Sequence, residues 1–220
     1  MKLVIANKNY SSWSLRPWLL LSTFEIEFEE IKLSLLPLGL SDRLGQYSPT
    51  KKVPVLIDGE LTVFDSLAIC EYISEQYLNG LAWPKDINVR AEARSICAEM
   101  HSGFFALRGK LPMNCRAKRN IELTEDVKLD IARIDDIWFG CRTKYSKLGP
   151  WLFGEFSIAD CFFAPVALRF STYQVSMSDI SSAYMNFVLG SQYIVRWIED
   201  ATREVEIILP GEVGDEVKFK

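Results

Sequence analysis

Three serines lie just before the first predicted helix, where their hydroxyls could take part in chemistry. The segment NYSSWSLRPW (9–18) places them between two apolar runs. Proline has no N–H and is tolerated in the first turn of a helix, so Pro17 predicts a helix with its N-cap near Ser14. Ser11 and Ser12 would then precede the helix, whose free N–H groups and dipole favour an anion. A hydroxyl there can hold a thiolate or oxyanion, although helix capping is the plain alternative.

Two more features could bind a ligand. Asp65-Ser66 joins a predicted strand to a helix expected over 66–78, and a helix N-terminus with a hydroxyl cap can hold a carboxylate or a phosphate. Val53-Pro54 opens a strand, where proline is allowed because the first residue need not donate to the ladder. Taken singly, each feature is better explained as a simple helix cap or strand start.

Other kinds of chemistry are not expected. His101 is the single histidine, it is distant in sequence from the serines, and no Gly-x-Ser-x-Gly occurs, which argues against a serine hydrolase. The five cysteines are scattered without a C-x-x-C pair, so a metal site lacks ligands at a usable spacing. We expect free, mostly buried thiols and a cytoplasmic protein.

Charge and hydropathy exclude two classes of partner. The net charge is −4, and the longest basic cluster is the four-residue stretch 116–119, which argues against nucleic-acid binding. No apolar run approaches the roughly 20 residues of a membrane span, and the first one is too short for a secretory signal. We therefore expect a globular protein that binds neither nucleic acid nor a membrane.

The two halves of the chain differ in their periodicity. The predicted strands are 2–7, 28–35, 53–58 and 61–65, and the helices between and after them are 15–24 and 66–78. A strand-helix-strand start predicts parallel pairing, and the tight connection at Gly59-Glu60 adds an antiparallel hairpin. Residues 79–88 lack periodicity and are expected to form a linker. Helical spacing alone follows, so we predict an α/β domain over 1–78 and an all-α domain over 89–220.

In combination, four segments resemble the cytosolic glutathione S-transferases in order and spacing. They are SSWSLRPW, SPTKKVPVL, FDSLAICEYI and FSIADCFFAP, the last containing a predicted capping box. The resemblance reaches about residue 205. It implies a thioredoxin-like N-terminal domain, an all-helical C-terminal domain, a homodimer, and glutathione as co-substrate with no metal.

The resemblance also assigns a catalytic hydroxyl. It falls on Ser12 or Ser11, and we favour Ser12 because it lies four residues before Arg16, as in the serine-type enzymes. The hydroxyl would hydrogen-bond the glutathione thiolate and lower its pKa from the ~8.5 of a free thiol. Trp13 stands where zeta-like and redox members carry a cysteine. Thiol–disulfide exchange through a protein thiol is therefore not expected.

The glutathione-binding residues follow by the same resemblance. Val53, before an expected cis-Pro54, would pair its backbone with the cysteinyl part. Asp65 and Ser66 would hold the γ-glutamyl group. Lys52 would approach the glycyl carboxylate, unless it is simply solvated.

The electrophile would lie against the C-terminal domain. The resemblance places Trp13, Met100, His101, Phe104 and Arg108 around it. The helical stripe formed by Met100 and Phe104 is, however, more typical of a hydrophobic core than of a substrate pocket.

The function implied is conjugation of glutathione to small, electrophilic, hydrophobic molecules, as in detoxification. Two alternatives stay open. One is a glutathione-dependent cis–trans isomerase similar to maleylacetoacetate isomerase, and the other is a non-catalytic interaction module, since fold does not imply function. The C-terminal segment 206–220 predicts no role; it could be disordered or fold back over the cleft.

Overall fold

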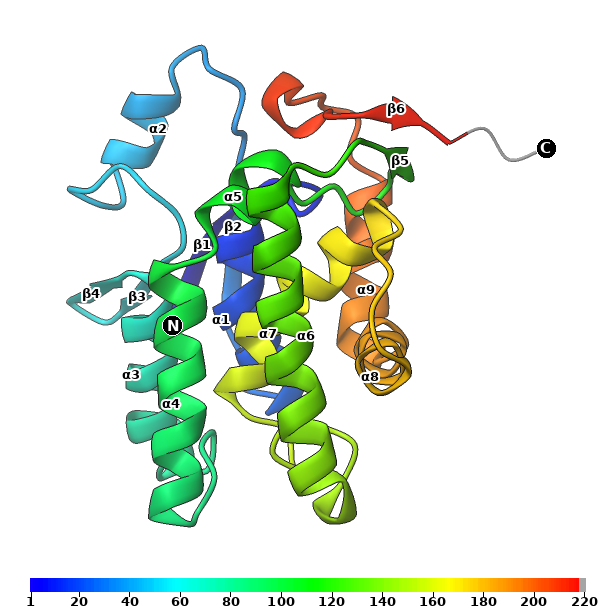
Figure 1. Cartoon of the computed structure of the whole chain (residues 1–220). Coiled ribbons are helices and arrows are strands. Elements are labelled where there is room, and N and C mark those ends of the chain that lie inside the picture. The colour runs from blue at the N-terminus through cyan, green and yellow to red at the C-terminus, as the bar shows by residue number, and fades with distance from the viewer. Residues whose placement is uncertain (218–220) are drawn as a thin grey trace.

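A four-stranded sheet begins the fold, as seen in the computed structural model, which describes residues 1–217. The strands are β1 (Lys2–Ala6), β2 (Glu29–Leu33), β3 (Val55–Asp58) and β4 (Leu61–Phe64), in the order β2-β1-β3-β4 (Figure 1). β1 and β2 are parallel, whereas β3 pairs antiparallel with both β1 and β4. The predicted parallel start and antiparallel hairpin are thus confirmed.

Three helices accompany the sheet: α1 (Ser12–Thr23), α2 (Leu40–Gly45) and α3 (Ser66–Leu78). The bounds of α3 agree with those predicted. The start of α1 does not, because the helix begins at Ser12 and Pro17 lies inside it. Proline removes one backbone hydrogen bond there. Almost every residue of α1 from Ser12 to Ser22 is buried, so packing outweighs that loss.

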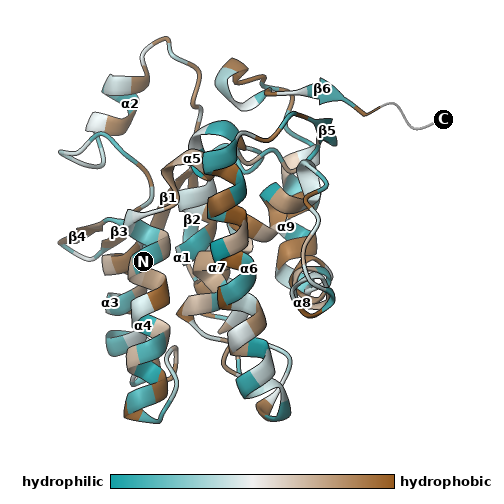
Figure 2. Ribbon diagram, in the orientation of Figure 1, coloured by the Kyte–Doolittle hydropathy of each residue, from teal (hydrophilic) through white to brown (hydrophobic). Residues whose placement is uncertain are grey.

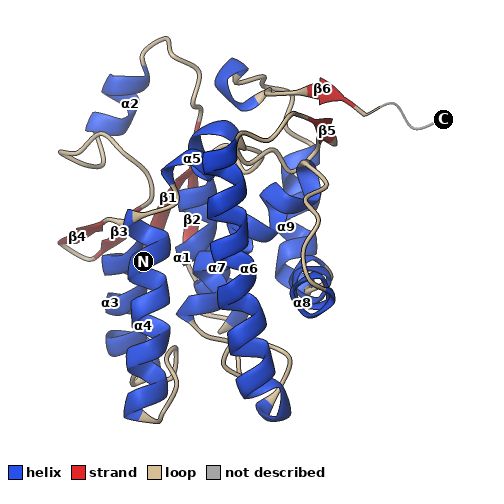
Figure 3. Ribbon diagram, in the orientation of Figure 1, coloured by secondary structure: helices blue, strands red, loops and turns tan. Residues whose placement is uncertain are grey.

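The rest of the described chain is almost wholly helical, as Figure 3 shows. The helices are α4 (Ile87–Ser102), α5 (Phe105–Lys110), α6 (Glu125–Tyr145), α7 (Ile158–Thr172), α8 (Asp179–Leu189) and α9 (Gln192–Thr202), with 3₁₀ turns at Ser146–Leu148 and Leu209–Gly211. Two short strands, β5 (Arg119–Asn120) and β6 (Asp215–Glu216), pair antiparallel. They were not predicted, because two-residue strands leave no periodic pattern. The fold is that of the predicted class, a thioredoxin-like α/β part followed by a helical part.

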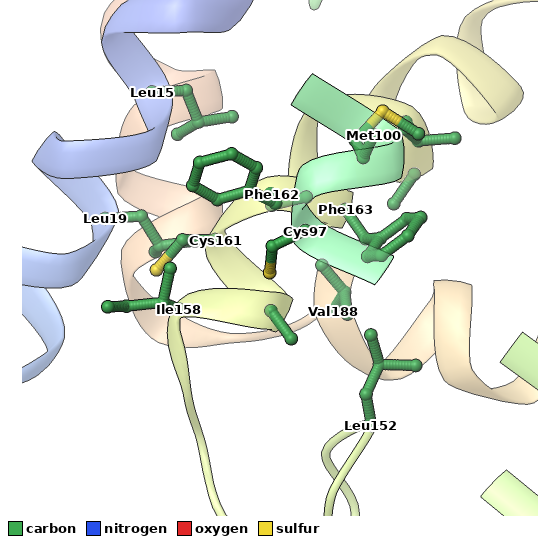
Figure 4. Close-up of a cluster of buried hydrophobic side chains, with 14 of the residues drawn as sticks. Leu15, Leu19, Cys97, Met100, Leu152, Ile158, Cys161, Phe162, Phe163 and Val188 are labelled. Carbon is green, nitrogen blue, oxygen red and sulfur yellow. The ribbon is translucent and has the colours of Figure 1, made fainter. Parts of the chain in front are cut away.

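Helix α7 is the centre of the hydrophobic core. All but one of its residues are buried, and α1 and α4 pack against it. Figure 4 shows Leu15 and Leu19 of α1 directed toward Phe162 and Cys161 of α7. The outer helices are amphipathic: in Figure 2, α6 and α9 alternate between hydrophobic and hydrophilic residues along their length.

The capping box predicted at the start of α7 is confirmed. Asp160 Oδ2 accepts a hydrogen bond from the N–H of Ser157 at 2.9 Å. Asp160 Oδ1 accepts from the N–H of Leu152 at 3.0 Å and from the hydroxyl of Tyr184 at 3.0 Å. This carboxylate therefore fixes α7 to the preceding loop and to α8.

Segment 206–217 packs back against the N-terminal part of the chain. The hydroxyl of Tyr10 donates to Glu212 Oε1 at 2.5 Å, and Asn114 Nδ2 donates to the carbonyl of Gly211 at 3.1 Å. A Cβ at Gly211 would lie 2.4 Å from the Tyr10 ring, so this close approach requires glycine. Residues 218–220, which follow this segment, lie outside the described part of the chain.

Candidate active site

A cavity of about 680 Å³ opens where the start of α1, the loop before β3 and the start of α3 meet. Its wall combines most of the residues expected from the sequence: Ser11, Ser12, Trp13, Lys52, Val53, Pro54, Asp65 and Ser66. These come from three separate segments, 11–13, 52–54 and 65–66, which the order of the strands brings together.

Ser12 lies on this wall, and its hydroxyl is hydrogen-bonded by a charged side chain. Its Oγ accepts a hydrogen bond from Arg169 Nη2 at 3.0 Å, and both residues are buried. Arginine has no acceptor, so the Ser12 proton is not used in this bond. Within residues 1–217, Ser12 Oγ makes no other side-chain hydrogen bond.

Ser11 and Ser14 form a separate pair. Their Oγ atoms are 2.7 Å apart, and Ser14 Oγ also accepts from the N–H of Ala6 at 3.1 Å. The predicted cap at Ser14 is wrong: Ser11 is the N-cap residue of α1, without a side-chain capping bond. The reason is that α1 starts before Ser14, whose hydroxyl is consequently directed to β1.

The Val53–Pro54 peptide is cis, as the resemblance implies. Val53 lies before the β-ladder, which begins at Val55 opposite Phe64. Lys52 is exposed beside it on the cavity wall.

Asp65 has a φ of 76°, an uncommon value for a residue other than glycine that often marks functional sites. It is the N-cap of α3, with Oδ1 accepting from the N–H of Leu67 at 2.8 Å. Its other oxygen lies 3.2 Å from His101 Nε2. Ser66 is buried and accepts from Arg16 Nη1 at 3.2 Å.

Residues expected to contact the electrophile separate into two groups. Met100 and Phe104 are buried in the core and do not line the cavity. His101 and Arg108 are partly exposed and do not line the cavity either, but both contact Trp13, which does: the Trp13 ring centroid is 5.3 Å from that of His101 and 5.3 Å from Arg108 Cζ. Burial lowers the pKa of His101, so the imidazole is neutral at pH 7.

Sequence reasoning missed the buried arginines behind the serines. The Arg16 guanidinium lies between the rings of Trp13 and Phe162, with Cζ 4.2 Å from each centroid. Burial lowers the pKa of Arg16 to about 9 and that of Arg169 to about 10, so both stay charged at neutral pH. A signal was present for Arg169, which is a single cation in the apolar run FFAPVALRF (162–170).

The described residues offer little to a metal ion. Across 1–217, no three His, Cys, Asp or Glu side chains lie close enough together to hold one. All five cysteines are free, and only Cys115 is not fully buried. No helix in that range has the length and hydropathy needed to cross a membrane.

Residues 10–76 match the family model described as "Glutathione S-transferase, N-terminal domain". A stringent starvation protein A homolog of Pasteurella multocida is 25% identical over 153 residues, 68% of each chain. Human glutathione S-transferase theta-1 is 39% identical over 64 residues, which cover 29% of this chain and 27% of that one. A probable maleylacetoacetate isomerase of Caenorhabditis elegans is 34% identical over 93 residues, 42% of each. The last two matches thus span less than half of either relative.

Solved structures share the whole fold. A maleyl pyruvate isomerase, a bacterial zeta-class glutathione S-transferase, superposes with a TM-score of 0.71 at 21% identity, covering 93% of this chain and 99% of that one. A glutathione transferase homolog from Burkholderia, solved with bound glutathione, gives a TM-score of 0.68 at 20% identity over 92% and 98% of the two chains. The chain thus contains a segment that matches the glutathione S-transferase N-terminal domain, and its two-part fold is that of these solved structures.

Proposed function

We propose that this protein is a glutathione transferase in which Ser12 stabilises the glutathione thiolate as it attacks a small, electrophilic, hydrophobic molecule. The observation behind the proposal is that Ser12, on the cavity wall, accepts from a buried guanidinium and keeps its own proton free. The match of residues 10–76 to the glutathione S-transferase N-terminal domain supports glutathione as the thiol. So does the bound glutathione in the Burkholderia homolog.

The cavity suits a tripeptide with two carboxylates and a thiolate. Its volume falls within the roughly 300–1,000 Å³ of small-molecule sites. The N-terminus of α3 at Ser66 would receive the γ-glutamyl carboxylate, and Asp65 its amino group. Lys52 would approach the glycyl carboxylate, and the backbone of Val53 would pair with the cysteinyl unit.

In the proposed reaction the thiol proton leaves to solvent, and the hydroxyl of Ser12 donates to the sulfur. The thiolate forms a bond to the electrophilic carbon and the leaving group departs with its electron pair. Each unit by which the thiol pKa falls corresponds to about 1.4 kcal/mol of thiolate stabilisation. Holding both reactants in one cavity adds to this by proximity.

A cis–trans isomerase is the second candidate. Arg108 favours it, because this half-buried guanidinium near Trp13 donates only to backbone carbonyls among the described contacts and could receive an acidic substrate. The C. elegans relative described as a probable maleylacetoacetate isomerase is consistent with that chemistry. In either case we propose a homodimer, which the family resemblance implies.

The test combines glutathione binding by calorimetry with conjugation of an aryl halide. We expect Ser12→Ala to bind glutathione within a few-fold of the wild type and to lose about 10- to 100-fold in rate, equal to one or two units of thiol pKa. Ser95→Ala is the control, since Ser95 is an exposed residue of α4 whose hydroxyl, within the described part of the chain, donates to the carbonyl of Ala91 alone.

The results discriminate between the candidates. A wild-type protein that does not bind glutathione would contradict the transferase and leave the interaction module. If Ser11→Ala lowers the conjugation rate and Ser12→Ala does not, the catalytic hydroxyl is that of Ser11. Turnover of maleylacetoacetate well above that of aryl halides would favour the isomerase.

A further inference from the structure

We propose that Arg169 is a positioning residue for Ser12: it fixes the hydroxyl so that its proton is directed at the thiolate, and its charge adds to thiolate stabilisation. This inference rests on the proposed function. It also explains why Ser12 and not Ser11 would make the bond.

The first argument is the set of partners that Arg169 has. Besides Ser12 Oγ, its guanidinium donates to the carbonyls of Leu111 and Arg108. All three acceptors are neutral, and no ion pair of Arg169 occurs among the described residues. A buried cation without a counter-ion is costly. An anion in the adjoining cavity would supply the missing negative charge.

The second argument concerns the Ser12 proton. A hydroxyl has one hydrogen and two lone pairs, and a guanidinium can only donate. The bond from Arg169 therefore occupies a lone pair and leaves the hydrogen for another acceptor. Accepting from a cation also polarises the O–H group and strengthens it as a donor.

Ser11 lacks this constraint. Its hydroxyl lies 2.7 Å from Ser14 Oγ, and either atom can be the donor. No charged side chain orients that pair, since the further partner of Ser14 is the N–H of Ala6. The two serines thus differ in their environment: among the described contacts, Arg169 hydrogen-bonds Ser12 and not Ser11.

Helix α7 holds Arg169 rigidly. After Asp160 in its first turn, Arg169 is the one charged residue of the helix. The capping box fixes the start of α7, and α1, which carries Ser12, packs along it. A purely structural role would be to connect α7 to the carbonyl of Leu111. In that role alone, Arg169 would contribute to the stability of the fold but would not change the pKa of a thiol at position 12.

A variant that needs no glutathione separates these roles. Ser12→Cys places a thiol where the hydroxyl accepts from Arg169, and its pKa can be read from the pH dependence of iodoacetamide labelling, followed on the peptide by mass spectrometry. We expect a pKa at least one unit below the ~8.5 of a free thiol. Adding Arg169→Gln should raise it by about one unit, a tenfold loss of thiolate below both values.

The matched control is Arg142→Gln in the same Ser12→Cys background. Arg142 also donates to two backbone carbonyls, those of Trp151 and Gly149, but within residues 1–217 its guanidinium hydrogen-bonds no serine side chain. This change should leave the labelling profile unaltered. A shift as large as that of Arg169→Gln would show a general loss of structure and would overturn the inference.

Further outcomes are decisive as well. If Arg169→Gln does not fold, the inference is decided by the pH dependence of labelling in Ser12→Cys alone. A thiol pKa at or above ~8.5 in that variant refutes the role of Arg169. A low pKa that persists in Arg169→Gln refutes it too. If the thiol behaves as expected but the wild type does not bind glutathione, the proposed function fails while the coupling between Arg169 and position 12 stands.

Discussion

Asp160→Ala should destabilise the protein strongly, because one carboxylate satisfies several buried donors. These are the N–H groups of Leu152 and Ser157 and the hydroxyl of Tyr184, at 2.9–3.0 Å. The three residues are at most 2% exposed. An unsatisfied buried donor costs about 1–3 kcal/mol, so even the lower value predicts a loss of about 3 kcal/mol. For a chain of this size, that lowers Tm by roughly 6–12 °C.

The assay is urea unfolding followed by tryptophan fluorescence, together with a thermal melt. Asp136→Ala is the control: Asp136 is exposed on α6, so the same chemical change there should alter the free energy of unfolding by less than about 0.5 kcal/mol. Asp160→Asn keeps one acceptor oxygen, so its loss in the free energy of unfolding should lie between those of Asp160→Ala and Asp136→Ala. A loss below about 1 kcal/mol in Asp160→Ala would refute the reasoning, since it would mean that other groups or water satisfy these donors.

Two other predictions concern ionisation, and one concerns redox chemistry. Burial lowers the pKa of His101 below 6.5, so the unfolded chain binds a proton at this residue more readily than the folded protein. The free energy of unfolding should therefore fall as pH drops below about 6.5. Urea unfolding at pH 7.5 and 5.5 should show a smaller fall for His101→Gln than for the wild type. Burial raises the pKa of the Cys70, Cys97 and Cys161 thiols, so the native protein should react with iodoacetamide far more slowly than the urea-unfolded chain; equal rates would contradict this burial. Among the described residues no cysteine lines the cavity, so no disulfide reductase activity is expected with a glutathione mixed disulfide as substrate, and robust activity would contradict this.

Local signals made part of the fold predictable. The helix Ser66–Leu78 starts at an Asp-Ser junction after a strand, and its bounds followed from that cap and from helical spacing. The parallel pairing of β1 with β2 followed from the strand-helix-strand order. The start of α1 did not follow, because Pro17 suggested a later cap and only the packing of the whole helix shows why an internal proline is tolerated.

The site was predictable where a known family supplied the pattern, and not where contacts are distant in sequence. Ser12 and Arg169 are separated by 157 positions, and nothing local to either residue indicates the other. Met100 and Phe104 illustrate another limit. Helical spacing shows that a face is buried, but it does not distinguish a core from the wall of a pocket. Tyr10, joined to Glu212 across the chain, was missed for the same reason as Arg169.

The most direct test of the central claim is the pKa of the glutathione thiol in its complex with the wild-type protein. It can be measured from the ultraviolet absorbance of the thiolate as a function of pH. We expect a value at least one unit below the ~8.5 of a free thiol, and a return toward that value in Ser12→Ala. A bound thiol with an unshifted pKa, or a lowered pKa that Ser12→Ala leaves in place, would contradict the account.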